Sequence, residues 1–171
     1  VGIPATLSAD QRADLEAALG AMEGVSLVTQ TSRPYKLASR EFHPEDTVIR
    51  IKDTVIGGGS FTIMAGPCSI ESEDGFRAAA EIVRASGATV LRGGAFKPRT
   101  SPYSFQGLRD EGLRILKKVG DDTGLVTITE VMSPDRVADV AAHADILQIG
   151  ARSMQNYPLL IEAGRSGKPV F

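Results

Sequence analysis

The sequence has few of the residues that stabilise small proteins through disulfides or structural metal sites. It has one cysteine, Cys68, two histidines and no tryptophan in 171 residues. A single cysteine excludes an intramolecular disulfide framework, and with only two histidines it also excludes a zinc finger. We interpret His43, in a polar segment, and His143, near the end of a predicted helix, as structural residues.

The sequence also lacks long apolar runs and an excess of either charge. No run approaches the roughly 20 apolar residues of a membrane span. The N-terminus shows no basic segment followed by an apolar stretch, as a secretion signal would. Nineteen basic against 21 acidic residues give a net charge of −2, which argues against dedicated nucleic-acid binding. We therefore expect a folded cytoplasmic protein that binds neither membranes nor nucleic acids.

The front of the chain predicts a helix and then a strand. Ser8 followed three residues later by Gln11 is typical of a helix N-terminus. We expect this helix to end at Gly24 and a short strand to follow over 25–28.

Composition divides the chain into four segments. Polar, proline-bearing sequence follows the first helix and strand, and two β-rich stretches separated by Lys52-Asp53 then predict a hairpin. The expected segments are a helix-and-strand piece over 1–31, a linker over 32–46, the hairpin over 47–60 and an α/β region over 61–171.

The last segment alternates short apolar strands with helices. Such strands are typical of a parallel sheet buried on both faces. The strands are expected over 61–65, 89–91, 126–129 and 146–149, the helices over 73–86, 105–119, 134–143 and 158–163, and a fifth strand opens at 169–171. Four such units in about 105 residues match half of a (β/α)8 barrel. A doubly wound sheet is the alternative.

Each predicted strand is followed by a reactive or charged side chain. These include Cys68, Arg92, Glu130 and Arg152, and the loop after Arg92 adds the segment Lys97-Pro98-Arg99-Thr100-Ser101. In a barrel the carboxyl ends of the strands converge on one mouth, where active sites lie. Because arginine forks match carboxylate and phosphate oxygens, this mouth predicts an enzyme for substrates with several anionic groups.

The role of Cys68 stays open on the sequence pattern. A lone cysteine is more often a small buried hydrophobic residue than a ligand. As a nucleophile it would need an activating base, which the sequence does not show. As one ligand of a divalent metal it would need others from elsewhere in the fold.

Three segments together resemble one enzyme family, 3-deoxy-D-arabino-heptulosonate 7-phosphate (DAHP) synthase. They are FTIMAGPCSIES at 61–72, LRGGAFKPRTSPYSFQGL at 91–108 and ILQIGARSMQN at 146–156. Residues 33–48 resemble the segment that joins an ACT-like regulatory domain to the barrel in one subgroup. The resemblance extends over residues 15–171. A sister family, which makes 3-deoxy-D-manno-octulosonate 8-phosphate, normally has Lys-Ala-Asn-Arg where this chain has Lys97-Pro98-Arg99-Thr100.

The resemblance implies a condensation of phosphoenolpyruvate with erythrose 4-phosphate, releasing phosphate, at the start of the shikimate pathway. It also implies a divalent metal (Mn, Fe, Co or Zn), with Cys68 as its thiolate ligand. By the same resemblance, Glu130 positions a water at the enol carbon. The implied substrate contacts are Arg92 and Lys97 for the phosphoenolpyruvate carboxylate, Ala151 and Arg152 for its phosphate, and Lys97, Pro98, Arg99, Thr100 and Ser101 for the aldose phosphate.

The resemblance further implies that the chain is a piece of a longer enzyme. Complete members continue with Lys-Arg-Gly, Asp-Pro-Ser-His and Glu-Val-His strands, which hold the other metal ligands and are absent here. Residues 1–31 resemble only the tail of the regulatory domain, which in the family binds aromatic amino acid effectors. We expect half a barrel that is inactive alone and self-associates, from a homo-oligomeric parent. The alternative is a non-catalytic half-barrel that binds phosphorylated ligands.

Overall fold

The computed structural model describes residues 6–28 and 35–171. These described residues form two compact units, the first ending at Thr47 and the second beginning at Val48. Each unit is described by itself. Within the described residues, no helix is both long and apolar enough to cross a membrane.

The first unit contains helix α1 (Ala9–Gly20) and a short 3₁₀ helix (Lys36–Ala38). The predicted capping box is present: the Ser8 hydroxyl accepts from the Gln11 N–H, and the Gln11 side chain accepts from the Ser8 N–H. The predicted end at Gly24 is wrong, because the helix ends at Gly20. The predicted strand over 25–28 is also wrong. A strand needs a neighbour for its backbone groups, and these residues have none in the described chain.

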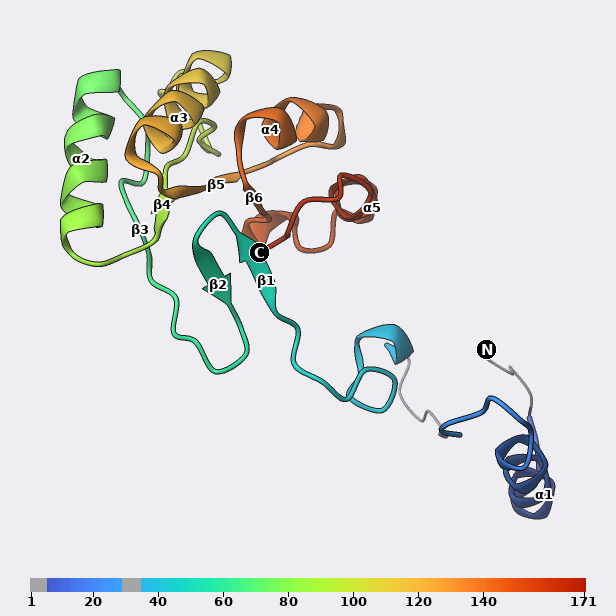
Figure 1. Cartoon of the computed structure of the whole chain (residues 1–171). Coiled ribbons are helices and arrows are strands. Elements are labelled where there is room, and N and C mark those ends of the chain that lie inside the picture. Colours follow the sequence, from blue (N-terminus) through green and yellow to red (C-terminus); the bar gives the residue numbers. More distant parts are fainter. Residues whose placement is uncertain (1–5, 29–34) are drawn as a thin grey trace. The chain divides into compact units, whose positions relative to one another are not determined.

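The second unit is built on a four-stranded parallel sheet in the order β3-β4-β5-β6 (Figure 1). The strands are β3 (Met64–Ala65), β4 (Val90–Arg92), β5 (Val126–Glu130) and β6 (Ile146–Gln148). Val170 forms a parallel bridge with Leu147, so the predicted fifth strand does begin beside β6. The strand order follows the chain without reversal. This is the progression of a partial (β/α)8 barrel, and it excludes a doubly wound sheet, whose order reverses at a switch point.

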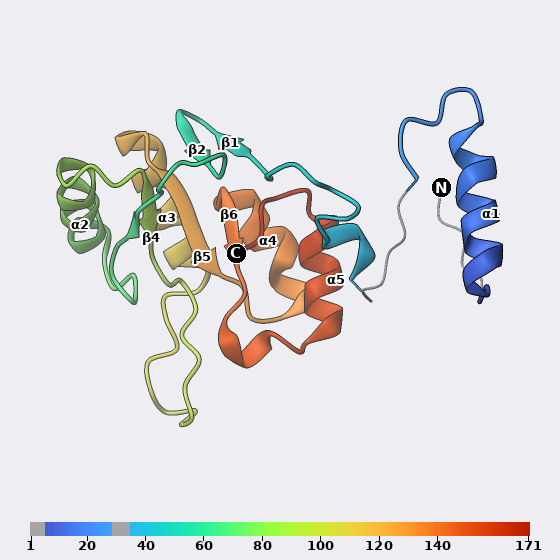
Figure 2. The ribbon, with the colours of Figure 1, turned by 90° about the horizontal axis from the view of Figure 1, so that it is seen from below.

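Helices follow the strands and cover the outer face of the sheet (Figures 1 and 2). They are α2 (Glu73–Ala85), α3 (Asp110–Thr123), α4 (Val137–His143), which follows a 3₁₀ turn (Pro134–Arg136), and α5 (Tyr157–Arg165). The layer between sheet and helices is the main core. It includes Phe76, Leu91, Leu113, Leu116 and Leu147.

Glycine misled the prediction of two helix ends. The helix predicted over 105–119 begins at Asp110 and continues through Gly120 to Thr123, and it is capped by Gly124, which has φ +74. A Cβ on Gly120 would lie 2.3 Å from Cγ2 of Thr127. Gly120 therefore serves close packing of helix on strand and does not end the helix. Helix α5 likewise continues past Gly164 to Arg165.

The predicted hairpin forms and covers the inner side of the sheet. Strands β1 (Ile49–Ile51) and β2 (Thr54–Ile56) pair antiparallel around Lys52-Asp53. Ile51 and Ile56 pack on a second, inner cluster. Its buried members are Val90, Val126, Ile128 and Ile146. The hairpin therefore supplies part of the apolar filling at the amino ends of the strands.

A polar latch fastens the hairpin to the sheet. Nζ of Lys52 donates to the Leu125 carbonyl at 2.8 Å and pairs with Oδ2 of Asp145 at 3.1 Å. The same Asp145 oxygen accepts from the N–H and the hydroxyl of Thr127 at 2.9 and 3.0 Å. One carboxylate thus joins the hairpin to β5 and the start of β6.

We expect Asp145→Asn to lower the free energy of unfolding by about 1–2 kcal/mol at neutral pH, because charge-assisted hydrogen bonds are lost. Burial raises the pKa of Asp145, but hydrogen bonds from Thr127 and Lys52 outweigh burial, so the pKa lies below its ordinary 3.8. The latch therefore stabilises the fold above that pH and is lost as pH falls through the folded-state pKa. Urea titrations from pH 7 to 3 should show the wild-type advantage over Asp145→Asn shrinking below about pH 4. A constant difference would contradict the latch.

Arg109 has a backbone conformation that favours glycine, with φ +53 and ψ −121 directly before α3. Such a conformation costs a residue with a Cβ about 1–3 kcal/mol. We expect Arg109→Gly to raise the free energy of unfolding by about 1 kcal/mol, after allowance for the greater freedom of glycine in the unfolded chain. Arg109→Ala is the matched control, since it removes the same side chain without relieving the strain. Equal stability of the two variants would contradict this account.

Candidate active site

A glycine lets the chain after β3 pass close to the carboxyl end of β4. Gly66 has φ +147, and a Cβ there would lie 2.0 Å from the Arg92 carbonyl oxygen. Nη1 of Arg92 donates to the Pro67 carbonyl at 3.2 Å. Beyond it, the Ile70 N–H donates to the Gly94 carbonyl at 3.0 Å. The segments after the two strands therefore lie against each other.

Cys68 and Lys97 are in direct contact at these strand ends. Nζ of Lys97 lies 2.8 Å from Sγ of Cys68 and 3.0 Å from its carbonyl oxygen. A Cβ on Gly94 would lie 2.5 Å from the same carbonyl oxygen, so only glycine allows the two loops to come this close. Cys68 is exposed, which contradicts the reading of this residue as a buried hydrophobe.

The surroundings favour a thiolate at Cys68. The pKa of the thiol lies below its ordinary value, chiefly because of the hydrogen bond from Lys97 and secondly because of the one from Arg92. These hydrogen bonds outweigh burial, which raises the pKa. A thiolate is the form of cysteine that binds metals and attacks electrophiles.

Arg92 lines a cavity on the inner side of the sheet, at the ends of the strands. Gln148, at the end of β6, lines the same cavity and brings an amide to it. The sequence analysis missed Gln148. Its position near the carboxyl end of the strand predicted over 146–149 is the feature that could have found it.

Glu130 ends β5 and lies against the segment that follows β6. A Cβ on Gly150 would lie 2.0 Å from Oε1 of Glu130, so the carboxylate occupies the space that a side chain would need. Ala151 and Arg152 follow in a short 3₁₀ helix (Ala151–Ser153) and are exposed. Among residues 6–28 and 35–171, the Arg152 side chain makes no hydrogen bond or ion pair.

The β4–α3 loop (residues 93–109) projects from the rest of the unit, at the bottom of Figure 2. Arg99 and Thr100 are exposed on it, and Pro98 and Ser101 are half-buried. Nε of Arg99 donates to the Phe105 carbonyl at 3.2 Å. The structure thus places these residues on one projecting loop, whereas Cys68, Lys97 and Arg92 lie together at its base.

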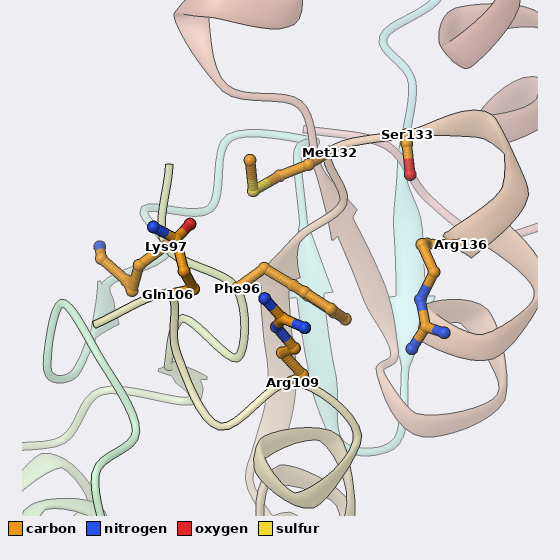
Figure 3. A pocket seen from close by; sticks show the side chains of 7 residues that line it. All are labelled: Phe96, Lys97, Gln106, Arg109, Met132, Ser133 and Arg136. Atoms are coloured by element: carbon orange, nitrogen blue, oxygen red, sulfur yellow. The ribbon is translucent and has the colours of Figure 1, made fainter. Parts of the chain in front are cut away.

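A second hollow lies beside the base of this loop (Figure 3). It is lined by Phe96, Lys97, Gln106, Arg109, Met132, Ser133 and Arg136. The Arg136 guanidinium lies 5.3 Å from the centre of the Phe96 ring and forms ion pairs with Asp110 and Asp139. Its charge is therefore already balanced, and we assign this hollow no ligand.

The described residues do not form a complete metal site around Cys68. No group of three or more histidine, cysteine, aspartate and glutamate side chains that could hold a metal ion is found in residues 6–28 and 35–171. The exposed Cys68, with its lowered pKa, suits one ligand position of a divalent metal. The remaining ligands of such a site would have to come from outside the described residues.

Comparisons with known proteins match the sequence and the fold of this chain to known enzymes. A Thermotoga maritima protein named phospho-2-dehydro-3-deoxyheptonate aldolase is 51% identical over 150 residues, which are 88% of this chain and 44% of the relative. The crystal structure of the T. maritima enzyme of that name, also called DAHP synthase, superposes with a TM-score of 0.79 at 46% identity. That match covers 99% of this chain and 48% of the other.

The sister family matches at lower identity. A 2-dehydro-3-deoxyphosphooctonate aldolase from Desulfatibacillum aliphaticivorans is 41% identical over 120 residues, 66% of this chain and 44% of the relative. This chain therefore spans less than half the length of the relatives it matches. The family described as the DAHP synthetase I family matches residues 42–171. The chain belongs to the DAHP synthetase I family.

Proposed function

We propose that the whole protein is a 3-deoxy-7-phosphoheptulonate synthase, which condenses phosphoenolpyruvate with erythrose 4-phosphate and releases phosphate. The observation that carries the proposal is the contact of Lys97 with Cys68 beside Arg92, at the strand ends of a chain in this family. The two cations, Lys97 and Arg92, and a thiolate at Cys68 lie together at the strand ends, which suits a metal-dependent reaction between two polyanions.

The residues at the base of the loop take the phosphoenolpyruvate in this proposal. Arg92, in the inner cavity with Gln148, binds the carboxylate together with Lys97. Arg152 and the Ala151 N–H bind the phosphate, which agrees with the exposure of both residues and the unpaired guanidinium. Fixed cations hold the substrate in one orientation and stabilise charge that develops as the phosphate leaves.

The projecting loop takes the aldose phosphate. The exposed Arg99 and Thr100 bind its phosphate, with Pro98 and Ser101 completing the segment. Lys97, at the base of the loop, lies between the two substrates. The carboxylate of Glu130 accepts a hydrogen bond from a water and holds it near the enol carbon, which must gain an oxygen as the carbon–oxygen bond to phosphate is lost.

Cys68 is the proposed thiolate ligand of a divalent metal, which is Mn, Fe, Co or Zn. When bound, such an ion supplies Lewis-acid polarisation of the aldehyde. Lys97 has a second role here, because its hydrogen bond lowers the pKa of the Cys68 thiol and so favours the thiolate that binds metals. The proposal for the whole protein also includes a cytoplasmic location, a homo-oligomer and an aromatic amino acid effector.

Carbon counting separates this function from that of the sister family. Phosphoenolpyruvate supplies three carbons, so a seven-carbon product needs a four-carbon aldose and an eight-carbon product needs a five-carbon one. We expect the whole protein, with a divalent metal, to release phosphate from phosphoenolpyruvate with erythrose 4-phosphate, at a kcat/KM at least tenfold above that with D-arabinose 5-phosphate, about the discrimination one carbon provides. The reverse preference would assign the octulosonate reaction. Phosphoenolpyruvate binding without turnover would favour a non-catalytic binding module.

A further inference from the structure

The β4–α3 loop is closed at its neck by two backbone hydrogen bonds. The Lys97 N–H donates to the Gln106 carbonyl, and the Arg109 N–H donates to the Ala95 carbonyl, both at 2.9 Å. Gly107 has φ +89, and a Cβ there would lie 2.2 Å from the Ala95 carbonyl oxygen. The two ends of the loop are therefore held together on both sides of the neck.

The tip of the loop is fastened to this neck by one side chain. Nε2 of Gln106 donates to the carbonyls of Ser101 and Ser104, each at 3.1 Å. The Ser104 N–H also donates to the Ser101 carbonyl, at 3.2 Å, which closes a turn at the tip. Gln106 is half-buried and lies beside Lys97 (Figure 3). It thus joins the base of the loop through its main chain and the tip through its amide.

Little else in the described chain orders the tip. Tyr103 is 98% exposed, and Arg99 and Thr100 are exposed as well. The Arg99–Phe105 hydrogen bond also lies within the loop. The order of the tip must therefore come largely from contacts inside the loop, and an ordered loop loses less conformational freedom when a ligand binds.

We propose that Gln106 is a positioning residue for the aldose phosphate. Its amide fixes the position of Arg99, Thr100 and Ser101 relative to Lys97. In this proposal Gln106 itself contacts neither substrate. This inference rests on the proposed function, since it takes the loop as the binding segment of the four-carbon substrate. It predicts that Gln106 affects the affinity for one substrate and not for the other.

The test is Gln106→Met in the whole protein, because methionine keeps the length of the side chain and removes both donated hydrogen bonds. Amide hydrogen exchange over residues 98–105 should become faster. The KM for erythrose 4-phosphate should rise about tenfold, as expected for two lost hydrogen bonds. The KM for phosphoenolpyruvate should stay within about twofold, since the neck bond of Lys97 uses the main chain. Ser104→Ala is the control: it keeps the carbonyl that Gln106 binds, and neither KM should change.

The outcomes separate the steps of the inference. Unchanged exchange in Gln106→Met would show that the amide does not fasten the tip. Faster exchange with an equal rise in both KM values, or with no rise for the aldose phosphate, would overturn the positioning role. A wild-type protein that condenses neither aldose phosphate would overturn the proposed function and this inference with it. The exchange rates would still show whether the Gln106 amide fastens the tip of the loop, so that failure can be told apart from a failure of this contact.

Discussion

Replacing Lys97 with methionine should slow phosphate release by the whole protein by about 10²-fold or more, the loss typical of removing one charge-stabilising group from an active site. The same substitution should change the chemistry of Cys68. Because Lys97 is the first cause of the lowered pKa of that thiol, its removal should bring the pKa back toward the ordinary 9.0. Alkylation of Cys68 by iodoacetamide at pH 7 should then become slower, since the thiolate is the reacting form.

Lys117→Met is the matched control for this experiment. Lys117 is a half-exposed lysine on α3 that pairs with Asp121 at 2.9 Å. Its removal deletes the same charge from the chain without touching Cys68. Alkylation rates measured from pH 5 to 10 give the pKa of the only cysteine in the sequence directly. If Lys97→Met and Lys117→Met leave the same pH profile, the Lys97–Cys68 contact has no chemical effect and the proposed role of Lys97 fails.

The sequence pattern predicted the second unit well because its elements follow strong local rules. The apolar strands, the hairpin turn at Lys52-Asp53 and the alternation of strand and helix gave the order of the elements and the barrel class. Errors arose where tertiary contacts decide. The first predicted strand is reduced to Met64–Ala65, because β3 is the edge of this sheet and Phe61 is 92% exposed. Gly120 was taken as a helix end, whereas the approach of Thr127 explains it.

For the candidate site, the sequence indicated which residues gather but not how they touch. That strand ends converge is a property of the fold class, so grouping Cys68, Arg92 and Lys97 needed only the order of strands. The hydrogen bond from Lys97 to Cys68 depends on the close approach of the two loops at Gly94. A glycine in a sequence does not by itself show which other segment packs against it. Gln148 has no motif of its own, and only its place in the cavity beside Arg92 marks it.

Gly150→Ala should lower the turnover of the whole protein by about 10²-fold, the effect of moving a catalytic group by roughly 1 Å. The added Cβ would lie 2.0 Å from Oε1 and 2.8 Å from Cδ of Glu130, so the carboxylate must leave its place. The fold should not suffer. Gly150 has φ −70 and ψ 156, which alanine adopts without strain. The clashing atoms are the flexible end of a side chain. Urea unfolding should therefore show no loss of stability.

Two further variants decide whether Glu130 transmits this effect. Gly164→Ala, where an added Cβ meets nothing within 4 Å, should leave turnover unchanged. Glu130→Gln alone should also lower turnover, because a neutral amide does not hold the water as a carboxylate does. If Gly150 acts only through Glu130, the double variant should be no slower than the slower single variant, since groups that act as one unit are not additive. A further loss in the double variant would mean that the Cβ also disturbs the neighbouring Ala151 N–H. In that case a glycine at position 150 would be needed both for the placement of Glu130 and for the phosphate site at Ala151.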